Sequence, residues 1–107
     1  MHDEIIVEPI EFEWDEGNKE KNYNKHGIKN EESEMVFFDE QSVLSLDSKH
    51  STRERRYQII GRSELGNALS VIFTLRDRKV RIISARRVNH KEKKFYESKK
   101  TEVHTNI

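Results

Sequence analysis

The sequence predicts an α+β domain in which two N-terminal helices precede an antiparallel β-meander and one C-terminal helix follows it. Four short apolar segments separated by turn residues occupy the middle of the chain, a pattern typical of strands joined in hairpins. Helix start and stop signals flank these segments, and we expect the helices to pack against one face of the sheet. The chain has 107 residues, of which 33% are hydrophobic and 37% charged, so a single domain with a thin core is expected.

The segment before the meander combines an extended stretch with the two predicted helices. Glutamates alternate with aromatic residues over residues 11–14, which predicts a short strand or extended segment with both rings on one face. Asp15 is a typical cap for a helix over residues 16–25, and Gly27 is a typical stop after it. A second helix is predicted over residues 29–38, because glutamates fill its first turns and apolar residues its end.

The four apolar segments have the lengths and periodicity of strands. Residues 68–75 carry apolar side chains at every second position, which predicts one buried face. In residues 79–87 the same alternation places Val80, Ile82 and Ser84 together on one face. The predicted strands cover residues 43–46, 55–62, 68–75 and 79–87.

The C-terminal part begins with a helix signal. Asn89 and Glu92 have the spacing of a capping box, which predicts a helix over residues 91–100. Phe95 and Tyr96 are its only large apolar residues. Because the chain has so few apolar side chains, we assign five of its aromatic residues to the core: Phe12, Trp14, Phe37, Phe73 and Phe95.

Charge is divided unequally along the chain although the net charge is zero. Residues 1–48 contain 14 acidic residues and 4 lysines, whereas residues 49–107 contain 16 basic and 6 acidic residues. Nine of those basic residues are arginines, the residue type suited to bidentate phosphate contacts. The basic half therefore favours a phosphate-rich partner, and a solvated charged surface is the alternative.

Several classes of protein are excluded by what the chain lacks. It has no cysteine, so it has neither a disulfide framework nor a thiolate nucleophile. The histidines have no metal-binding spacing and there is no glycine-rich phosphate loop, so we expect no metal and no cofactor. No apolar run is long enough to span a bilayer and the N-terminus is acidic, which predicts a cytoplasmic protein without membrane contact.

Arginines recur at the ends of the predicted strands, where antiparallel neighbours can bring them together. In a regular strand Arg81 and Arg86 point to opposite faces, so only a bulge would place both on one face. Such a cluster can hold a phosphate, or it can be surface charge that deters edge-to-edge aggregation, and both readings stay open. The arginines concerned are Arg56, Arg76, Arg78, Arg81 and Arg86.

His26 is a candidate general acid or base, because imidazole titrates near neutral pH. Metal-free cleavage of a phosphodiester needs a group that deprotonates the ribose 2′-OH, a group that protonates the leaving oxygen, and cations. His26 with Lys25, Glu54 and the arginines meets this list. The alternative is that His26 is an ordinary cation at a helix C-terminus.

Two motifs, Lys25-His26-Gly27 and Arg81-Ile82-Ile83-Ser84-Ala85-Arg86, occur in a specific order with several shorter ones. The shorter ones are Phe12–Asp15, Asn22, Ile28, Glu31–Glu32, Val36–Phe37, Arg56–Arg62, Val71–Thr74, Arg87, Glu92 and Tyr96. Together they resemble the BrnT toxin family over roughly residues 11–97. The resemblance implies a RelE-like fold with a twisted antiparallel sheet, and it implies a ribonuclease that blocks translation. It also implies neutralisation by a BrnA-like DNA-binding antitoxin, whose complex with the toxin represses their promoter.

The resemblance also implies positions and boundaries. The catalytic residues expected from it are Lys25, His26, Arg56, Arg81 and Arg86, and the expected RNA-binding residues are Arg76, Arg78 and Arg87. RNA is the expected substrate, and promoter DNA is expected to be contacted only through the antitoxin complex. We expect residues 1–10 to be a lead-in, residues 11–98 a BrnT-like toxin domain, and residues 99–107 a flexible tail.

A second class of function stays open beside the ribonuclease. A catalytically inactive RNA- or protein-binding module of the same fold, which acts with its antitoxin in transcriptional autoregulation, would have the same sequence features. A DNA-binding repressor is less suited, because the chain lacks a helix-turn-helix with a basic recognition helix.

Overall fold

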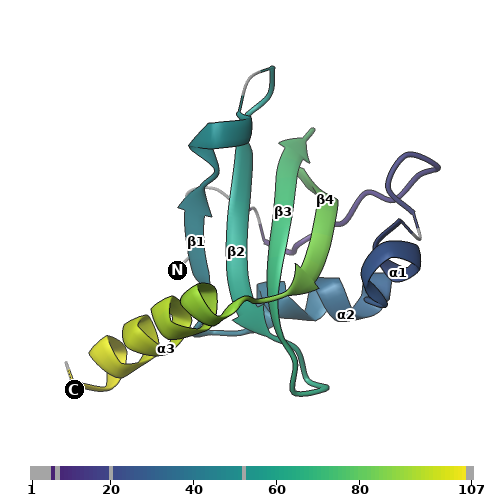
Figure 1. Cartoon of the computed structure of the whole chain (residues 1–107). Coiled ribbons are helices and arrows are strands. Elements are labelled where there is room, and N and C mark those ends of the chain that lie inside the picture. The colour runs from purple at the N-terminus through teal and green to yellow at the C-terminus, as the bar shows by residue number, and fades with distance from the viewer. Residues whose placement is uncertain (1–5, 7, 20, 52, 106–107) are drawn as a thin grey trace.

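The computed structural model describes residues 6, 8–19, 21–51 and 53–105 (Figure 1). Its strands form one antiparallel sheet in the order β1-β2-β3-β4. The α+β class, the meander and the C-terminal helix are therefore confirmed. In chain order the elements are α1 (Lys21–His26), α2 (Asn30–Met35), the 3₁₀ turn η1 (Val36–Phe38), β1 (Val43–Leu46), the 3₁₀ turn η2 (Ser48–His50), β2 (Arg56–Arg62), β3 (Ala68–Arg76), β4 (Lys79–Arg87) and α3 (His90–Thr105).

The strand boundaries agree with the sequence to within one residue, because turn residues separate the strands. The turn between β3 and β4 consists of Asp77 and Arg78, whose φ angles are 50° and 68°. Positive φ at both central residues is the geometry of a two-residue hairpin that follows the right-handed twist of the strands. This tight turn places the end of β3 beside the start of β4.

A β-bulge in β4 changes which side chains are buried. The register shifts at Phe73 of β3, and Ile83 is the extra residue in β4. Before the bulge the alternation of β4 is as predicted, but after it Ala85 is buried and Ser84 is not. The prediction that Ser84 shares a face with Val80 and Ile82 is therefore wrong, because a bulge reverses the alternation beyond it.

The first predicted helix is shorter than the sequence indicates, since α1 covers only the second half of residues 16–25. The Asp15 carboxylate accepts the backbone N–H of Gly17 at 2.8 Å and so closes a turn. The Asn18 side chain is only 3% exposed and donates to the backbone carbonyl of Ile82 in β4 at 3.1 Å. These contacts hold the segment in a turn and delay the start of the helix.

The second predicted helix, over residues 29–38, is also shortened. After Met35 its last three residues form the 3₁₀ turn η1, in which Phe37 is buried and Phe38 is exposed. Gly27 ends α1 with a φ of 71°, a left-handed conformation that glycine adopts without steric cost. The stop predicted at this glycine is confirmed.

The N-terminal segment covers the outer edge of β4. Phe12 forms a parallel bridge with Val80, and the Glu13 N–H donates to the Val80 carbonyl at 2.8 Å while the Val80 N–H donates to Glu11. These bonds satisfy backbone groups that an edge strand would otherwise expose. Ile6, inside the expected lead-in, is only 2% exposed and belongs to the core.

Aromatic rings fill the centre of the core. The Phe37 ring packs edge-on against Phe12 and Phe73, with centroids 5.3 and 5.0 Å away. Phe37 and Phe73 are buried, and Phe12 and Trp14 are partly buried against the same cluster. Four of the five aromatic residues assigned to the core therefore lie in it or against it. The fifth, Phe95, is 44% exposed, and its neighbour Tyr96 is buried instead.

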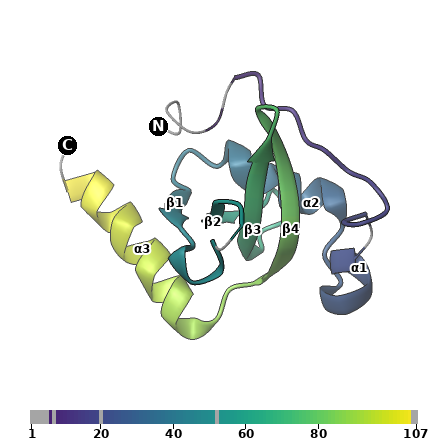
Figure 2. The same cartoon turned by 90° about the horizontal axis from the view of Figure 1, so that it is seen from above.

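The helices do not share one face of the sheet. Figures 1 and 2 show α2 behind the strands and α3 across the opposite face at one end. The expectation that all helices cover one face is therefore wrong. Only one side of α3 meets the sheet, and successive helical residues point about 100° apart, which explains why Tyr96 rather than Phe95 is buried.

Helix α3 begins as the sequence predicts but ends later. The Asn89 side chain accepts the Glu92 N–H at 2.8 Å, and the Glu92 carboxylate accepts the Asn89 N–H at 3.0 Å. This reciprocal pair confirms the predicted capping box. The helix continues to Thr105, beyond the predicted end at residue 100, because no glycine or proline interrupts it.

Candidate functional site

The bulge in β4 places Arg81 and Arg86 on the same face of the sheet, which they share with Arg56 of β2 and which is here called the arginine face. Arg81 pairs with Thr74 of β3, and Arg86 pairs with Ser70. Thr74 and Ser70 are four residues apart in β3 and point the same way. Arg56 of β2 pairs with Thr74 from the other side, so its Cα lies about 10 Å from that of Arg81.

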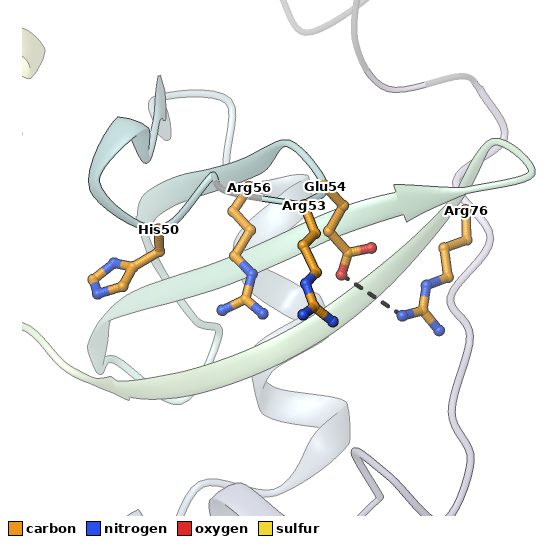
Figure 3. Close-up of a pocket in the computed structure, with 5 residues that line it drawn as sticks. All are labelled: His50, Arg53, Glu54, Arg56 and Arg76. Carbon is orange, nitrogen blue, oxygen red and sulfur yellow. Dashed lines mark ion pairs between the residues drawn. The ribbon is translucent and has the colours of Figure 1, made fainter.

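A pocket of about 350 Å³ lies at the end of the arginine face that is farther from α3. Figure 3 shows the side chains that line it. Three arginines and one glutamate make the lining cationic, which suits an anionic ligand group. The lining residues are His50, Arg53, Glu54, Arg56 and Arg76.

The connection between β1 and β2, here called the pocket loop (residues 47–51 and 53–55), supplies three of the lining residues. Its neck is closed by the Asp47 N–H, which donates to the Arg56 carbonyl at 2.8 Å. The Ser51 hydroxyl donates to the Asp47 carbonyl at 2.6 Å and accepts the Arg56 N–H at 2.9 Å. The ends of the loop are therefore held together by backbone and hydroxyl bonds beside Arg56.

Arg76 reaches the pocket from the end of β3. Its guanidinium forms ion pairs with Glu54 at 3.6 Å, as Figure 3 shows, and with Glu13 at 3.9 Å. The Arg76 side chain is 47% exposed, so these pairs orient it without removing it from solvent. An incoming anion can therefore reach the Arg76 guanidinium.

Arg81 is held by carboxylates of the N-terminal segment. Its guanidinium donates to Asp15 at 2.7 and 2.9 Å and to Glu13 at 3.0 Å. The hydrogen bond from Arg81 lowers the pKa of Asp15, and the bond to Asp15 raises the pKa of Arg81. A phosphate could bind Arg81 only in competition with these two carboxylates.

Arg86 is held in the same manner at the other end of the face. Its guanidinium donates twice to Glu92, at 2.8 and 2.9 Å, and Gln58 donates to both Glu92 and Ser70. Burial alone would raise the pKa of Glu92, but the hydrogen bonds from Arg86 and from the Asn89 backbone hold that pKa below its ordinary value. Arg86 thereby joins β4 to the start of α3.

The other predicted site residues lie apart from the pocket. Lys25 and His26 end α1, which packs beside β4 (Figure 1). Arg78 is exposed in the β3–β4 turn. Arg87 pairs with Leu69, whose side chain is buried in the core, so Arg87 belongs to the face opposite the arginine face.

Two lining residues, His50 and Arg53, were missed by the sequence reasoning, which gave neither of them a functional role. The available signal was the arginine-rich run before β2, in which Arg53 precedes two further arginines. Periodicity cannot reveal such residues, because a loop has no regular faces. Only the closure of the pocket loop places His50 and Arg53 beside Arg56.

The described residues contain neither a metal-binding cluster nor a membrane-spanning helix. Among them, no group of three or more histidine, cysteine, aspartate or glutamate side chains could hold a metal ion. Within the same part of the chain, every helix is too short or too polar to cross a bilayer.

Comparison with known proteins identifies a family. No curated protein matches the chain significantly. The family described as ribonuclease toxin, BrnT, of type II toxin-antitoxin system matches residues 14–92. This range includes the whole sheet, the pocket loop and α1, so it contains every predicted site residue. Members of such a family have an RNA target and an antitoxin partner. The chain belongs to the BrnT family of ribonuclease toxins of type II toxin–antitoxin systems.

Proposed function

We propose that this chain cleaves RNA endonucleolytically, without a metal ion, by attack of a ribose 2′-OH on the adjacent phosphate. Such cleavage would inhibit translation, and a BrnA-like antitoxin would neutralise it. The observation that carries the proposal is the cationic pocket, which is lined by Arg53, Arg56 and Arg76 together with one glutamate. Together with membership of a ribonuclease family, the pocket supplies the charge that metal-free cleavage requires.

The proposed reaction requires the pocket to bind a phosphate whose negative charge grows as the 2′-oxygen attacks it. Guanidinium groups that already point at this position stabilise that charge without reorganising, which is the largest contribution in many enzymes. Arg56 is partly buried at the start of β2 and is anchored by its own backbone bonds to the pocket loop. In the proposal, Arg56 binds the scissile phosphate. Arg76, which is oriented by Glu54, contacts the same phosphate or the next one along the RNA.

The remaining predicted residues receive supporting roles in the proposal. Arg81 and Arg86 already form ion pairs with carboxylates. We therefore propose that they bind the phosphates of flanking nucleotides, which would replace these carboxylates or bind beside them. Lys25 and Arg78 lie at the margins of the sheet and would contact the backbone of a longer RNA. His26 is proposed as an acid or base, in a position beside β4.

The test is incubation of a labelled free RNA with the purified protein in EDTA, beside the Arg56→Ala, His26→Ala and Lys19→Ala variants. We expect the wild type and Lys19→Ala, a change at an exposed residue that does not line the pocket, to leave 2′,3′-cyclic phosphate ends. Arg56→Ala should cleave roughly 100-fold more slowly, as when one charge-stabilising donor is lost. If free RNA stays intact, the same variants are tested with translating ribosomes. RNA that also stays intact there contradicts the proposal.

A binding module without catalysis is the second candidate, and one observation favours it. Glu13, Asp15 and Glu92 already compensate the charges of Arg81 and Arg86, which leaves fewer free cations for catalysis. Such a module would bind RNA or its antitoxin, act in autoregulation, and contact promoter DNA only through the antitoxin. Binding of RNA by the wild type with no cleavage, free or on ribosomes, would support this candidate.

A further inference from the structure

We propose that His50 is the group that accepts the 2′-OH proton at the pocket, with Asp47 as its positioning residue. The inference rests on the proposed ribonuclease function and deepens it by assigning the proton transfer. His50 lies at one end of the row of side chains that line the pocket, next to Arg56 (Figure 3).

The first support is the contact between His50 and Asp47. The His50 Nδ1 atom lies 3.1 Å from one Asp47 carboxylate oxygen and 3.3 Å from the other. An ionised carboxylate only accepts hydrogen bonds, so a neutral His50 ring carries its proton on Nδ1. Its Nε2 atom then has a free lone pair, which is the arrangement that a carboxylate imposes on a histidine base.

The second support is the way the structure positions Asp47. Its side chain is only 15% exposed, whereas that of His50 is 63% exposed. The backbone of Asp47 is bound on both sides, through its N–H to Arg56 and through its carbonyl to Ser51. A fixed carboxylate thus orients an accessible imidazole, as a general base requires.

The third support is the surroundings of His50. The charged groups around it are Asp47 in its own loop, Arg53 and Glu54 farther along that loop, and Arg56 and Arg76 from β2 and β3. The arginines can hold the phosphate while the imidazole reaches the neighbouring ribose. His26, by contrast, ends α1 beside β4, and no described side chain of α1 lines the pocket.

The proposed step is a transesterification without an added reactant. The 2′-OH proton passes to the His50 Nε2 atom, and the 2′-oxygen forms a bond to phosphorus. The bond from phosphorus to the 5′-oxygen breaks, and that oxygen takes a proton from water to become a 5′-hydroxyl. The products are a 2′,3′-cyclic phosphate and a 5′-hydroxyl end, and the imidazolium returns its proton to solvent.

The experiment measures the pH dependence of kcat/KM for cleavage by the full chain, on free RNA or, if required, on translating ribosomes. The variants are His50→Gln, Asp47→Asn and His26→Gln, with His90→Gln as the matched control at an exposed position on α3. Thermal unfolding of each variant establishes that it is folded. Because Asp47→Asn keeps the backbone bonds of the loop, it separates the effect of the carboxylate from loss of structure.

If His50 is the base, His50→Gln lowers kcat/KM by about 100-fold or more and removes the rising acidic limb of the pH profile. Asp47→Asn lowers kcat but leaves KM close to the wild-type value, because the imidazole loses the carboxylate that orients it while the arginines that bind the phosphate stay in place. A merely structural role of Asp47 would change kcat and KM together, because it would disturb the arginines of the pocket as well.

The inference is overturned if His50→Gln cleaves RNA with the wild-type rate and pH profile while Arg56→Ala is impaired. In that case the ribonuclease function stands, and a loss in His26→Gln would transfer the proton-accepting role to His26. A wild type that leaves RNA intact in both assays overturns the ribonuclease proposal itself, and the role of His50 with it.

Discussion

Asp39 connects three parts of the chain through one carboxylate. Its Oδ2 atom accepts the backbone N–H of Arg62 at 2.8 Å and the hydroxyl of Tyr96 at 2.7 Å. The close approach depends on Gly61, where an added Cβ would lie 2.9 Å from a methyl carbon of Val36 and 3.2 Å from Asp39. A residue without a side chain in β2 thus allows η1 and its following loop to pack tightly against the sheet.

Tyr96→Phe is expected to destabilise the protein by about 1 kcal/mol, the usual net value of one hydrogen bond. Burial and the bond to Asp39 raise the pKa of Tyr96 to about 12, from an ordinary value of 10.0. The stability linked to this group is therefore fully present below about pH 10 and is lost as pH rises toward 12. Urea unfolding at neutral and alkaline pH measures both effects.

The control for this prediction is Tyr23→Phe, because the Tyr23 side chain is 52% exposed and should tolerate the change. We expect the Tyr96→Phe variant to lose less stability than the wild type between neutral and alkaline pH. An equal alkaline loss in both proteins would show that Tyr96 is not the group responsible.

At the scale of elements, the bulge in β4 and the capping box of α3 together position Arg86. The bulge turns Arg86 to the arginine face, and the capping box holds Glu92 where Arg86 can bind it with two hydrogen bonds. The lowered pKa of Glu92 means that this stability is present above the ordinary glutamate pKa and is lost as pH falls through the folded value. The start of α3 is thus tied to the sheet by one ion pair.

Asn89→Ala is expected to lower the free energy of unfolding by about 1 kcal/mol, because it removes the side-chain oxygen that caps α3. The same change frees one N–H of the first helical turn and loosens Glu92 against Arg86. Far-ultraviolet circular dichroism during urea unfolding checks the loss. Asn89→Asp retains a capping oxygen and should keep the wild-type midpoint, so an equal loss in both variants would contradict the capping role.

At the scale of the whole molecule, the two oppositely charged halves of the chain meet along β4. Glutamates and an aspartate of the N-terminal segment bind Arg76, Lys79 and Arg81 of the β3–β4 hairpin. The pocket loop lies beyond this zone of compensated charge. We therefore infer that RNA would be attracted mainly by the pocket and by the lysine side chains of α3, and that binding would weaken with salt.

Affinity for a 2′-O-methylated RNA, which cannot be cleaved by 2′-OH attack, is expected to fall steeply as salt rises. Each phosphate contact to a single strand contributes about 0.7 to the slope of log affinity against log salt concentration. Arg56→Ala should reduce that slope by about this amount. Lys19→Ala, at an exposed position in the acidic half, should leave it unchanged, and an unaltered slope in Arg56→Ala would remove Arg56 from the phosphate contacts.

Much of the architecture could be read from short-range patterns in the sequence. Alternation over residues 68–75 and turn residues at 77–78 predict β3 and its hairpin, and the Asn89–Glu92 spacing predicts the start of α3. The start of α1 could not be predicted, because the Asn18 side chain bonds to β4, more than 60 residues away. The choice between Phe95 and Tyr96 likewise depends on which side of α3 meets the sheet.

The candidate site, like the fold, could be predicted from the sequence only in part. The sequence by itself determined the antiparallel meander, the basic C-terminal half and the arginines at the strand ends, since these depend on residue types and nearest neighbours. Tertiary structure alone decided that a bulge aligns Arg81 with Arg86, that carboxylates bind both, and that His50 and Arg53 join Arg56 and Arg76 around one pocket. Register and loop closure depend on contacts between residues far apart in the chain, and a local pattern carries no information about them.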